Sequence, residues 1–223
     1  MERTRPTISV LCPVWNNARY LPAALASVSA QTLAPDEIIV VDDGSTDDSA
    51  AIAEATPGVR CVLAAHGGVA AARNAALAVA SGDILAWLDS DDLWTPDKLE
   101  VQLAYLLAHP EVDVCFTQQR MFVEPGVEVP HWVRPDELAG ETPVIATCSM
   151  MVRRTQFNLV GGFDTLRESG EDTDWTLRAM AEGLQIGVAP ATLLLRRIHA
   201  GNLSTMKHGG RFEMLRFLRL SIA

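Results

Sequence analysis

The sequence has no long apolar run. Its longest apolar stretches, such as residues 145–152, are far shorter than the about 20 residues that a membrane-spanning helix needs. Residues 1–20 also lack the long apolar core and the small-residue cleavage site of a signal peptide. We therefore expect no transmembrane segment and a cytoplasmic location.

Basic side chains are scarce. The chain has 18 Lys and Arg against 28 Asp and Glu, which gives a formal net charge of -10 and a sequence pI of about 4.9. Binding to duplex nucleic acid needs a basic face, so we expect no nucleic-acid partner. A phosphate-bearing ligand would need a metal ion to balance its charge in so acidic a protein.

Paired cysteines are missing as well. The four cysteines show no C-x-x-C pair, and no histidines follow at zinc-finger spacing. In a reducing compartment, free buried thiols are the simplest expectation. The residues concerned are Cys12, Cys61, Cys115 and Cys148.

The two common glycine-rich nucleotide motifs are absent. No G-x-G-x-x-G follows the first apolar strand, which argues against a dinucleotide-dependent dehydrogenase. No G-x-x-x-x-G-K-[ST] occurs either, so the chain is not a P-loop protein. Any phosphates must be held by something other than a glycine nest.

Short apolar strands alternate with alanine-rich helical segments in the first half. We expect strands over residues 7–14, 36–43, 59–64 and 82–89, buried on both faces, and helices over residues 19–30, 47–55 and 69–80. Strand, helix and strand in this order predict βαβ units and a parallel sheet, hence an α/β fold.

Further elements are expected beyond the fourth strand. Thr95 and Pro96 predict the start of a helix that ends near His109 and buries Leu99, Leu103, Leu106 and Leu107. Residues 124–143 predict a polar loop. Residues 173–183 predict a helix with Leu177, Met180, Ala181 and Leu184 inward, and residues 211–222 predict a last amphipathic helix that packs on the core, on a membrane or on another subunit.

Acidic residues follow two of the predicted strands, where open α/β sheets bind ligands. Asp42 and Asp43 follow the second strand, and Asp89, Asp91 and Asp92 follow the fourth. Carboxylate oxygens suit Mg²⁺ or Mn²⁺ bridging a diphosphate. A plain turn or helix-capping role is the alternative for each group.

Several motifs together resemble family 2 glycosyltransferases. They are "PVWNNARYL" after the first strand, "IIVVDDGSTDDS", "GGVAAARNAAL", "LDSDDLW", "GGFD", "GEDTDWTLR" and "RIHAGNLS", in this order over residues 7–204. The resemblance implies the GT-A fold, a Rossmann-like, mostly parallel central sheet flanked by helices, with a smaller acceptor-side half. It also implies one continuous domain, with a nucleotide-sugar-binding half over residues 1–110 and an acceptor-binding and catalytic-base half over residues 111–223.

The resemblance assigns a donor site. Asp42 would accept the imide N–H of uracil or thymine, because a carboxylate can only accept hydrogen bonds. Arg73 would donate to the neighbouring base carbonyl, with a surface ion pair as the alternative. The remaining nucleotide-sugar-binding positions implied are Pro13, Val14, Trp15, Asn16, Asp89 and Ser90.

A divalent cation, Mn²⁺ or Mg²⁺, is implied by the same resemblance. Asp91 would be its principal ligand, with Asp89 nearby and Asp92 less clearly placed. His199 would reach the metal or the leaving phosphate, and a structural role is the alternative. Asn202 and Ser204 would contact phosphate or acceptor.

The catalytic base implied by the "GED" motif is Asp172, with Glu171 in reserve. Asp172 is expected at a helix N-terminus, where the helix dipole favours an ionised, proton-accepting carboxylate. The alternative is that both acids cap this helix.

The function implied is that of an inverting, metal-dependent glycosyltransferase of the hexosyltransferase type. It would move a sugar from a nucleoside diphosphate sugar, UDP- or dTDP-linked by preference, to an acceptor hydroxyl. Glycan, lipid-linked sugar, peptide and small metabolite all remain open as acceptors. The alternatives are a sugar-phosphate nucleotidyltransferase, whose usual basic glycine-rich loop is missing here, and a non-catalytic nucleotide-sugar-binding protein.

Overall fold

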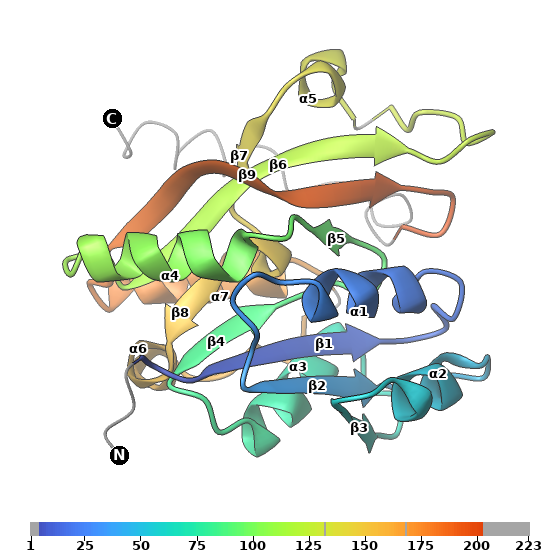
Figure 1. The fold of residues 1–223 in the computed structure, drawn as a ribbon, viewed down its shortest axis with the longest axis horizontal. Coiled ribbons are helices and arrows are strands. Elements are labelled where there is room, and N and C mark those ends of the chain that lie inside the picture. Colours follow the sequence, from blue (N-terminus) through green and yellow to red (C-terminus); the bar gives the residue numbers. More distant parts are fainter. Residues whose placement is uncertain (1–4, 132, 168, 203–223) are drawn as a thin grey trace.

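The computed structural model describes residues 5–131, 133–167 and 169–202. In these residues nine strands form one sheet, and helices cover both of its faces (Figure 1). The strands are β1 (Ile8–Val14), β2 (Glu37–Asp42), β3 (Val59–Leu63), β4 (Ile84–Trp87), β5 (Leu93–Trp94), β6 (Val114–Val123), β7 (Thr142–Val144), β8 (Met151–Arg153) and β9 (Ile186–Ile198). The helices are α1 (Leu21–Ser29), α2 (Ser49–Ala55), α3 (Val69–Val79), α4 (Lys98–Ala108), α5 (Pro135–Ala139), α6 (Arg154–Val160) and α7 (Glu171–Ala181), with the short 3-10 helix η1 (Thr147–Ser149).

The strand order across the sheet is β3-β2-β1-β4-β8-β6-β9-β5, and β7 pairs with β6 outside this path. Strands β1 to β4 form parallel pairs, as the βαβ pattern predicts. β8 runs antiparallel between β4 and β6, and β6 pairs in parallel with β9. The predicted α/β class with its parallel core is therefore confirmed, and antiparallel strands extend the sheet into the second half.

The two faces of the sheet are covered by different helices. Ile8, Val10 and Cys12 of β1 belong to a core with α1, α2 and α4. Leu11 of β1 and Trp87 of β4 belong to a second core with α3, α6 and α7. Successive strand residues point to opposite faces, so central strands covered on both sides need apolar residues almost throughout.

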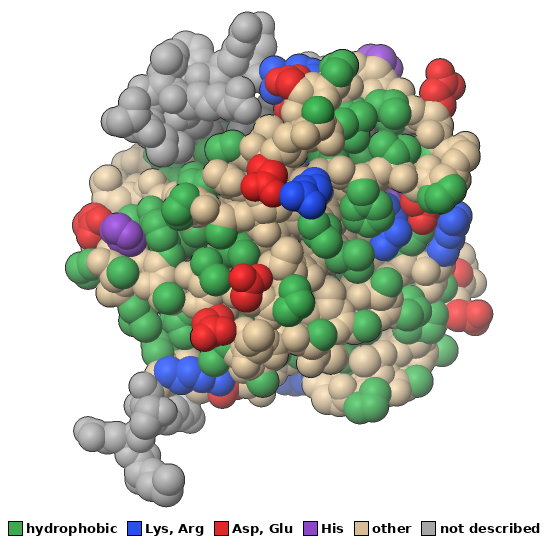
Figure 2. All heavy atoms as spheres, turned by 45° about the horizontal axis from the view of Figure 1, so that its top comes forward, with side chains coloured by type: hydrophobic (Ala, Val, Ile, Leu, Met, Phe, Trp, Pro, Cys, Tyr) green, Lys and Arg blue, Asp and Glu red, His purple; other side chains and the backbone are tan. Residues whose placement is uncertain are grey.

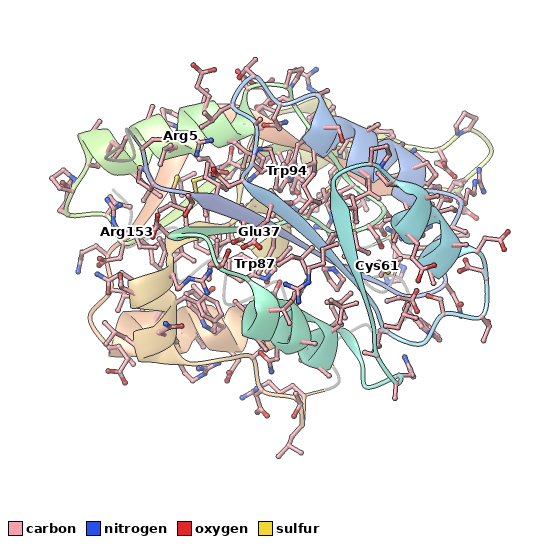
Figure 3. The ribbon with its side chains drawn as sticks, turned by 60° about the horizontal axis from the view of Figure 1, so that its bottom comes forward. Arg5, Glu37, Cys61, Trp87, Trp94 and Arg153 are labelled. Carbon is pink, nitrogen blue, oxygen red and sulfur yellow. The ribbon has the colours of Figure 1, made fainter. Side chains whose placement is uncertain are left out.

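Strand β3 departs from this pattern. All four predicted strands of the first half are present, but β3 lies at the edge of the sheet and is not buried on both faces, since Leu63 is 63% exposed. Cys61 on this strand is half-buried (Figure 3). The other three cysteines are buried, and all four are free thiols.

Helix α4 begins later than predicted. Thr95 N–H donates to Leu193 O of β9 at 3.1 Å, so the residues just before it extend the sheet as β5. The helix then begins at Lys98, with Asp97 in the capping position. The predicted apolar stripe is right at three positions and wrong at one: Leu99, Leu103 and Leu106 are buried, whereas Leu107 is 56% exposed.

Helix α7 presents a different face to the core than predicted. Leu177 and Met180 are exposed, and so is Ala181, whereas Leu184 is buried as expected. The buried positions in the helix include Trp175, Thr176 and Ala179. The Trp175 ring stacks on Phe157 with centroids 4.7 Å apart, and its Nε1–H donates to Gly161 O at 2.9 Å. This contact turns the Trp175 side inward.

The segment predicted as one polar loop, residues 124–143, contains secondary structure. Helix α5 and the start of β7 fall inside it. Val133 of this segment packs with Met121 of β6 and Ile198 of β9 in a small apolar cluster. The predicted helix 211–222 and Ser204 lie outside the described residues. Within the described part of the chain, each helix is too short or too polar to cross a membrane.

The strand directions bring the motif residues to one edge of the sheet. β8 is antiparallel to both β4 and β6, so β6 and β9 run in the same direction as β1, β2 and β4. The arrowheads of β1, β2, β6 and β9 accordingly point to the same side in Figure 1. Ligands of open α/β sheets bind at the carboxyl ends of such strands, so we expect a site at the carboxyl ends of β1, β2, β4, β6 and β9.

Candidate active site

The turn after β2 is held by its own two aspartates. Asp42 accepts a hydrogen bond from Ser45 N–H at Oδ1, 2.8 Å away, while its Oδ2 is buried without a partner among the described residues. Asp43 accepts from Gly67 and Gly68 N–H at 2.8 and 2.9 Å, which fixes the start of α3. Asp43 thus has the structural role that the turn alternative predicts, whereas Asp42 keeps an unsatisfied acceptor.

Gly44 allows this turn to close. Its φ is +70°, and a Cβ there would lie 2.9 Å from His66 N. The His66 ring lies against Trp15, with centroids 4.6 Å apart and an interplanar angle of 23°. Trp15 is 46% exposed although it is a large aromatic residue at a strand end. The Trp15 ring is therefore supported by His66 on one face and still open to a ligand.

The predicted donor-site residues after β1 lie beside these groups. Val14 is in register with Asp42 across β1 and β2, next to Pro13 and Trp15. Asn16 N–H donates to Ser45 Oγ at 2.9 Å, which links the two loops. Ser90 Oγ accepts from Asn17 Nδ2 at 2.7 Å, so the loop after β4 is tied to the loop after β1.

Arg73 joins the loop after β4 to the start of α7. It lies on α3 and is 4% exposed. Its guanidinium donates to Asp89 Oδ1 at 3.0 Å and to Glu171 Oε1 at 2.5 Å. Burial alone would lower the pKa of Arg73, but Asp89 and then Glu171 raise it above its ordinary value, so the group stays charged. These two carboxylates already engage the guanidinium. The predicted hydrogen bond from Arg73 to a carbonyl of the nucleotide base stays a prediction.

Asp91 meets His199 and Asn202 from the loop after β9. His199 Nε2 lies 3.0 Å from Asp91 Oδ2, and Asn202 Nδ2 donates to the same oxygen at 3.2 Å. Gly201 N–H donates to His199 Nδ1 at 3.2 Å. A neutral ring that accepts at Nδ1 carries its proton on Nε2, so this geometry favours His199 as a donor to Asp91 rather than as a metal ligand.

The carboxylate oxygens at this edge fit a hard divalent cation. Among the described residues, the bonds from His199 and Asn202 both fall on Oδ2 of Asp91, which leaves Oδ1 to face a ligand. Asp89 likewise uses Oδ1 for Arg73. Ligating carboxylates are usually oriented by such hydrogen bonds. Asp91 and Asp89 therefore remain suitable ligands, and His199 is better suited to orient Asp91.

Asp92 is buried beside them. Its Oδ1 accepts from Arg197 N–H of β9 at 2.9 Å. Burial, and then the neighbouring Asp91, raise the pKa of Asp92 well above its ordinary value. Three side chains of the described residues bring potential metal-ligating atoms within 4.8 Å of one another: Asp89, Asp92 and Cys148.

Asp172 lies in the first turn of α7, as predicted. It is 6% exposed, and its Oδ1 accepts from Thr173 N–H at 2.8 Å. The capping position is Gly170, with a φ of +77°, and it has no side chain to cap the helix. Neither acid therefore occupies the capping position that the alternative requires. Glu171 is engaged by Arg73, so of the two acids Asp172 is the better placed to serve as a base.

Sequence reasoning missed Tyr20, Glu124 and Cys148. Tyr20 OH donates to Glu124 Oε2 at 2.8 Å, and the Tyr20 ring packs on His199 with centroids 4.3 Å apart. Glu124 directly follows β6, just as Asp43 follows β2, so the rule that singled out acids at strand ends could have found it. Cys148 gave no such signal.

Comparison with known proteins places these motifs in a family. The sequence profile of Glycosyl transferase family 2 matches residues 9–161. The chain belongs to this family.

On the face in Figure 2, Lys and Arg side chains stand beside Asp and Glu side chains rather than in one extended basic surface.

Curated relatives resemble the chain over much of its length. A putative glycosyltransferase, EpsE, of Bacillus subtilis is 32% identical over 199 residues, which is 81% of this chain and 69% of that protein. The chondroitin synthase of Pasteurella multocida is 29% identical over 80% of this chain but only 19% of that protein. An uncharacterized glycosyltransferase of Rickettsia typhi is 29% identical over 76% of this chain and 57% of that protein. The chain thus spans less than two thirds of the length of several relatives that it matches.

Solved structures share the fold. S. aureus TarS 1–349 in complex with UDP-GlcNAc superposes with a TM-score of 0.70, at 23% identity, over 96% of this chain and 65% of that one. The complex of the same protein with UDP gives a TM-score of 0.68, at 23% identity, over 86% of this chain and 60% of that one. At this identity the likeness establishes the fold.

Proposed function

We propose that the chain has the activity of an inverting, metal-dependent glycosyltransferase that uses a UDP- or dTDP-sugar and an acceptor hydroxyl. The observation that carries this proposal is the placement of four carboxylates: Asp42 with its unpartnered oxygen, Asp89 and Asp91 after β4, and Asp172 at the start of α7, which Arg73 ties to Asp89 through Glu171. Family membership supports glycosyl transfer over the nucleotidyltransferase alternative.

The base pocket would lie between Trp15 and Asp42. A buried carboxylate oxygen without a partner costs about 1 to 3 kcal/mol, and the imide N–H of uracil or thymine would satisfy it. Adenine and cytosine have no such donor. The half-exposed Trp15 ring, backed by His66, offers a flat surface on which a base can stack. The complexes of TarS with UDP and UDP-GlcNAc support a uridine donor.

The diphosphate would lie at Asp91 and Asp89. A bound Mn²⁺ or Mg²⁺ would neutralise the diphosphate and stabilise it as a leaving group. His199 and Asn202 orient the Asp91 carboxylate, since both donate to its Oδ2. Arg73 orients the Asp89 carboxylate by donating to its Oδ1.

Asp172 would take the proton of the attacking hydroxyl. The N-terminus of α7 favours its charged form, because the peptide dipoles place partial positive charge there. Glu171, one residue earlier, would not serve as the base because it is paired with Arg73. That ion pair fixes the start of α7 against the donor half. A single base facing the leaving group fits one in-line displacement, which inverts the anomeric carbon.

Calorimetric titration with nucleotides in Mn²⁺ tests the donor assignment. We expect UDP and dTDP to bind at least tenfold more tightly than ADP and CDP, because losing a hydrogen bond to a buried charged group costs roughly 1.5 to 3 kcal/mol. Asp42→Asn should reduce this preference while leaving Mn²⁺-dependent binding in place. Equal affinity for UDP and ADP in the wild-type protein contradicts the base pocket. A UDP-release assay with a panel of UDP-hexoses then identifies the sugar.

A further inference from the structure

Cys148 occupies an unusual position for a buried thiol. It lies in η1, is 3% exposed, and its carbonyl accepts a bond from Trp94 Nε1 at 3.4 Å. The next residue, Ser149, donates to Val144 O at 2.8 Å, which further fixes η1. No hydrogen bond joins the Cys148 sulfur to a described residue. The thiol is therefore held in place by its backbone, while its sulfur is unpartnered.

The sulfur faces two carboxylates. Ligating atoms of Cys148, Asp89 and Asp92 all lie within 4.8 Å of one another. Asp89 uses one oxygen for Arg73 and Asp92 uses one oxygen for Arg197 N–H, so each carboxylate has a second oxygen to offer. The Asp89 side chain is 34% exposed, which gives an ion a route from solvent. The other two groups are buried.

The chemistry of this donor set differs from that of a diphosphate cation. Mg²⁺ and Mn²⁺ prefer oxygen, whereas Zn²⁺ and its heavier analogue Cd²⁺ accept a thiolate together with carboxylates. Bond lengths of about 2.0 to 2.3 Å place tetrahedral zinc ligands about 3.6 Å apart. Side-chain movements of about 1 Å would therefore bring the ligating atoms of Asp89, Asp92 and Cys148 to bonding distance of one ion.

We propose that Asp89, Asp92 and Cys148 form a binding site for a thiophilic divalent cation, Zn²⁺ or Cd²⁺, with the fourth position open to water. Binding releases the thiol proton and forms a metal–thiolate bond. The site shares Asp89 with the one expected around Asp91, whereas Asp92 and Cys148 belong to it alone. Asp89 lies between the two, so a thiophilic ion would compete with its role toward the donor.

Cd²⁺ titration followed by ultraviolet absorbance tests the site without any activity measurement, because a Cd²⁺–thiolate bond gives a charge-transfer band. We expect the wild-type protein to develop this band up to one equivalent of Cd²⁺. Cys148→Ser should abolish it. The matched control is Cys115→Ser, another buried cysteine of the same core, whose sulfur is hydrogen-bonded to Gln102 and Phe116; it should keep the band.

A second variant guards against an unstable Cys148→Ser protein. Asp92→Asn removes one ligand and keeps the thiol, so we expect the band to persist with at least tenfold weaker Cd²⁺ affinity. No band in the wild-type protein would overturn the proposal. So would a band that survives Cys148→Ser, which would place the ion at another of the free cysteines, or an unchanged affinity in Asp92→Asn.

Discussion

Lys98 is the residue whose charge is most at odds with its surroundings. It is 0% exposed, its Nζ lies 2.5 Å from Gln102 Oε1 and it sits 4.0 Å from the centroid of the Trp94 ring. Burial lowers the pKa of Lys98 to about 7, although Cys115 and Cys148 act in the opposite direction. The folded protein therefore bears a cost for the ammonium ion below pH 7, and that cost fades as the pH rises toward the ordinary lysine pKa.

This cost predicts that the difference in the free energy of unfolding between wild type and Lys98→Met depends on pH. Between pH 7 and 9 the unfolded chain keeps the Lys98 proton while the folded protein loses it, so wild-type stability should rise by about 2 kcal/mol relative to the variant. Other titrating groups are shared by both proteins and cancel in the difference. Urea unfolding at both pH values measures it. A constant difference would mean that Lys98 is not neutralised in the fold.

At the residue scale, the sequence identified acids but not their partners. Asp42 and Asp91 could be singled out because strand ends are visible in a hydrophobic pattern, whereas Asp172 was implied by the resemblance of the "GED" motif to the family. That Arg73 binds Asp89 and Glu171 could not be predicted, because Glu171 is 98 positions away along the chain. Pairings of this kind depend on how helices pack over the sheet.

At the scale of elements, a cluster around Glu124 connects the end of β6, the start of α1 and the end of β9. Glu124 lies 3.0 Å from Arg19 and 3.4 Å from Arg197, besides accepting the Tyr20 hydroxyl. The Arg197 guanidinium in turn donates to Asp91 O at 3.0 Å. The loop that carries Asp91 is thus braced by elements far apart in sequence.

Two variants of Tyr20 separate the hydrogen bond from the ring contact. Tyr20→Phe removes the bond to Glu124, which keeps its arginines, so we expect a loss of about 1 kcal/mol in stability and near-normal Mn²⁺-dependent UDP binding. Tyr20→Ala also removes the support of His199 and should weaken that binding at least tenfold. Calorimetry with UDP and Mn²⁺ compares them. Equal affinities would show that the ring does not position His199.

Helix α7 shows why an element can be predicted while its orientation is not. Leu177, Met180, Ala181 and Leu184 follow helical spacing, but so do the buried Trp175, Thr176 and Ala179. The sequence therefore offers two faces of similar apolar character. The structure selects the second because Trp175 stacks on Phe157 and Glu171 binds Arg73. Long-range packing made this choice.

At the scale of the whole molecule, residues 1–110 and residues 111–223 contribute strands to one sheet. β4 of the first half pairs with β8 of the second, and Arg73 crosses to Glu171. We therefore predict that the two halves unfold together as one domain. Urea transitions followed by tryptophan fluorescence and by far-ultraviolet circular dichroism should coincide. Two separated transitions would instead indicate independent halves.

The most direct test of the account is turnover of UDP-sugar by Asp172→Asn, measured together with UDP affinity. Asp172 is assigned to the acceptor's proton, so kcat should fall by roughly 10² to 10⁴ while the Kd for UDP in Mn²⁺ stays within a few fold of wild type. Asp91→Ala is the contrasting control, and it should lose metal-dependent UDP binding. A fully active Asp172→Asn protein, or one that binds UDP as poorly as Asp91→Ala, would contradict the assignment of Asp172 as the catalytic base.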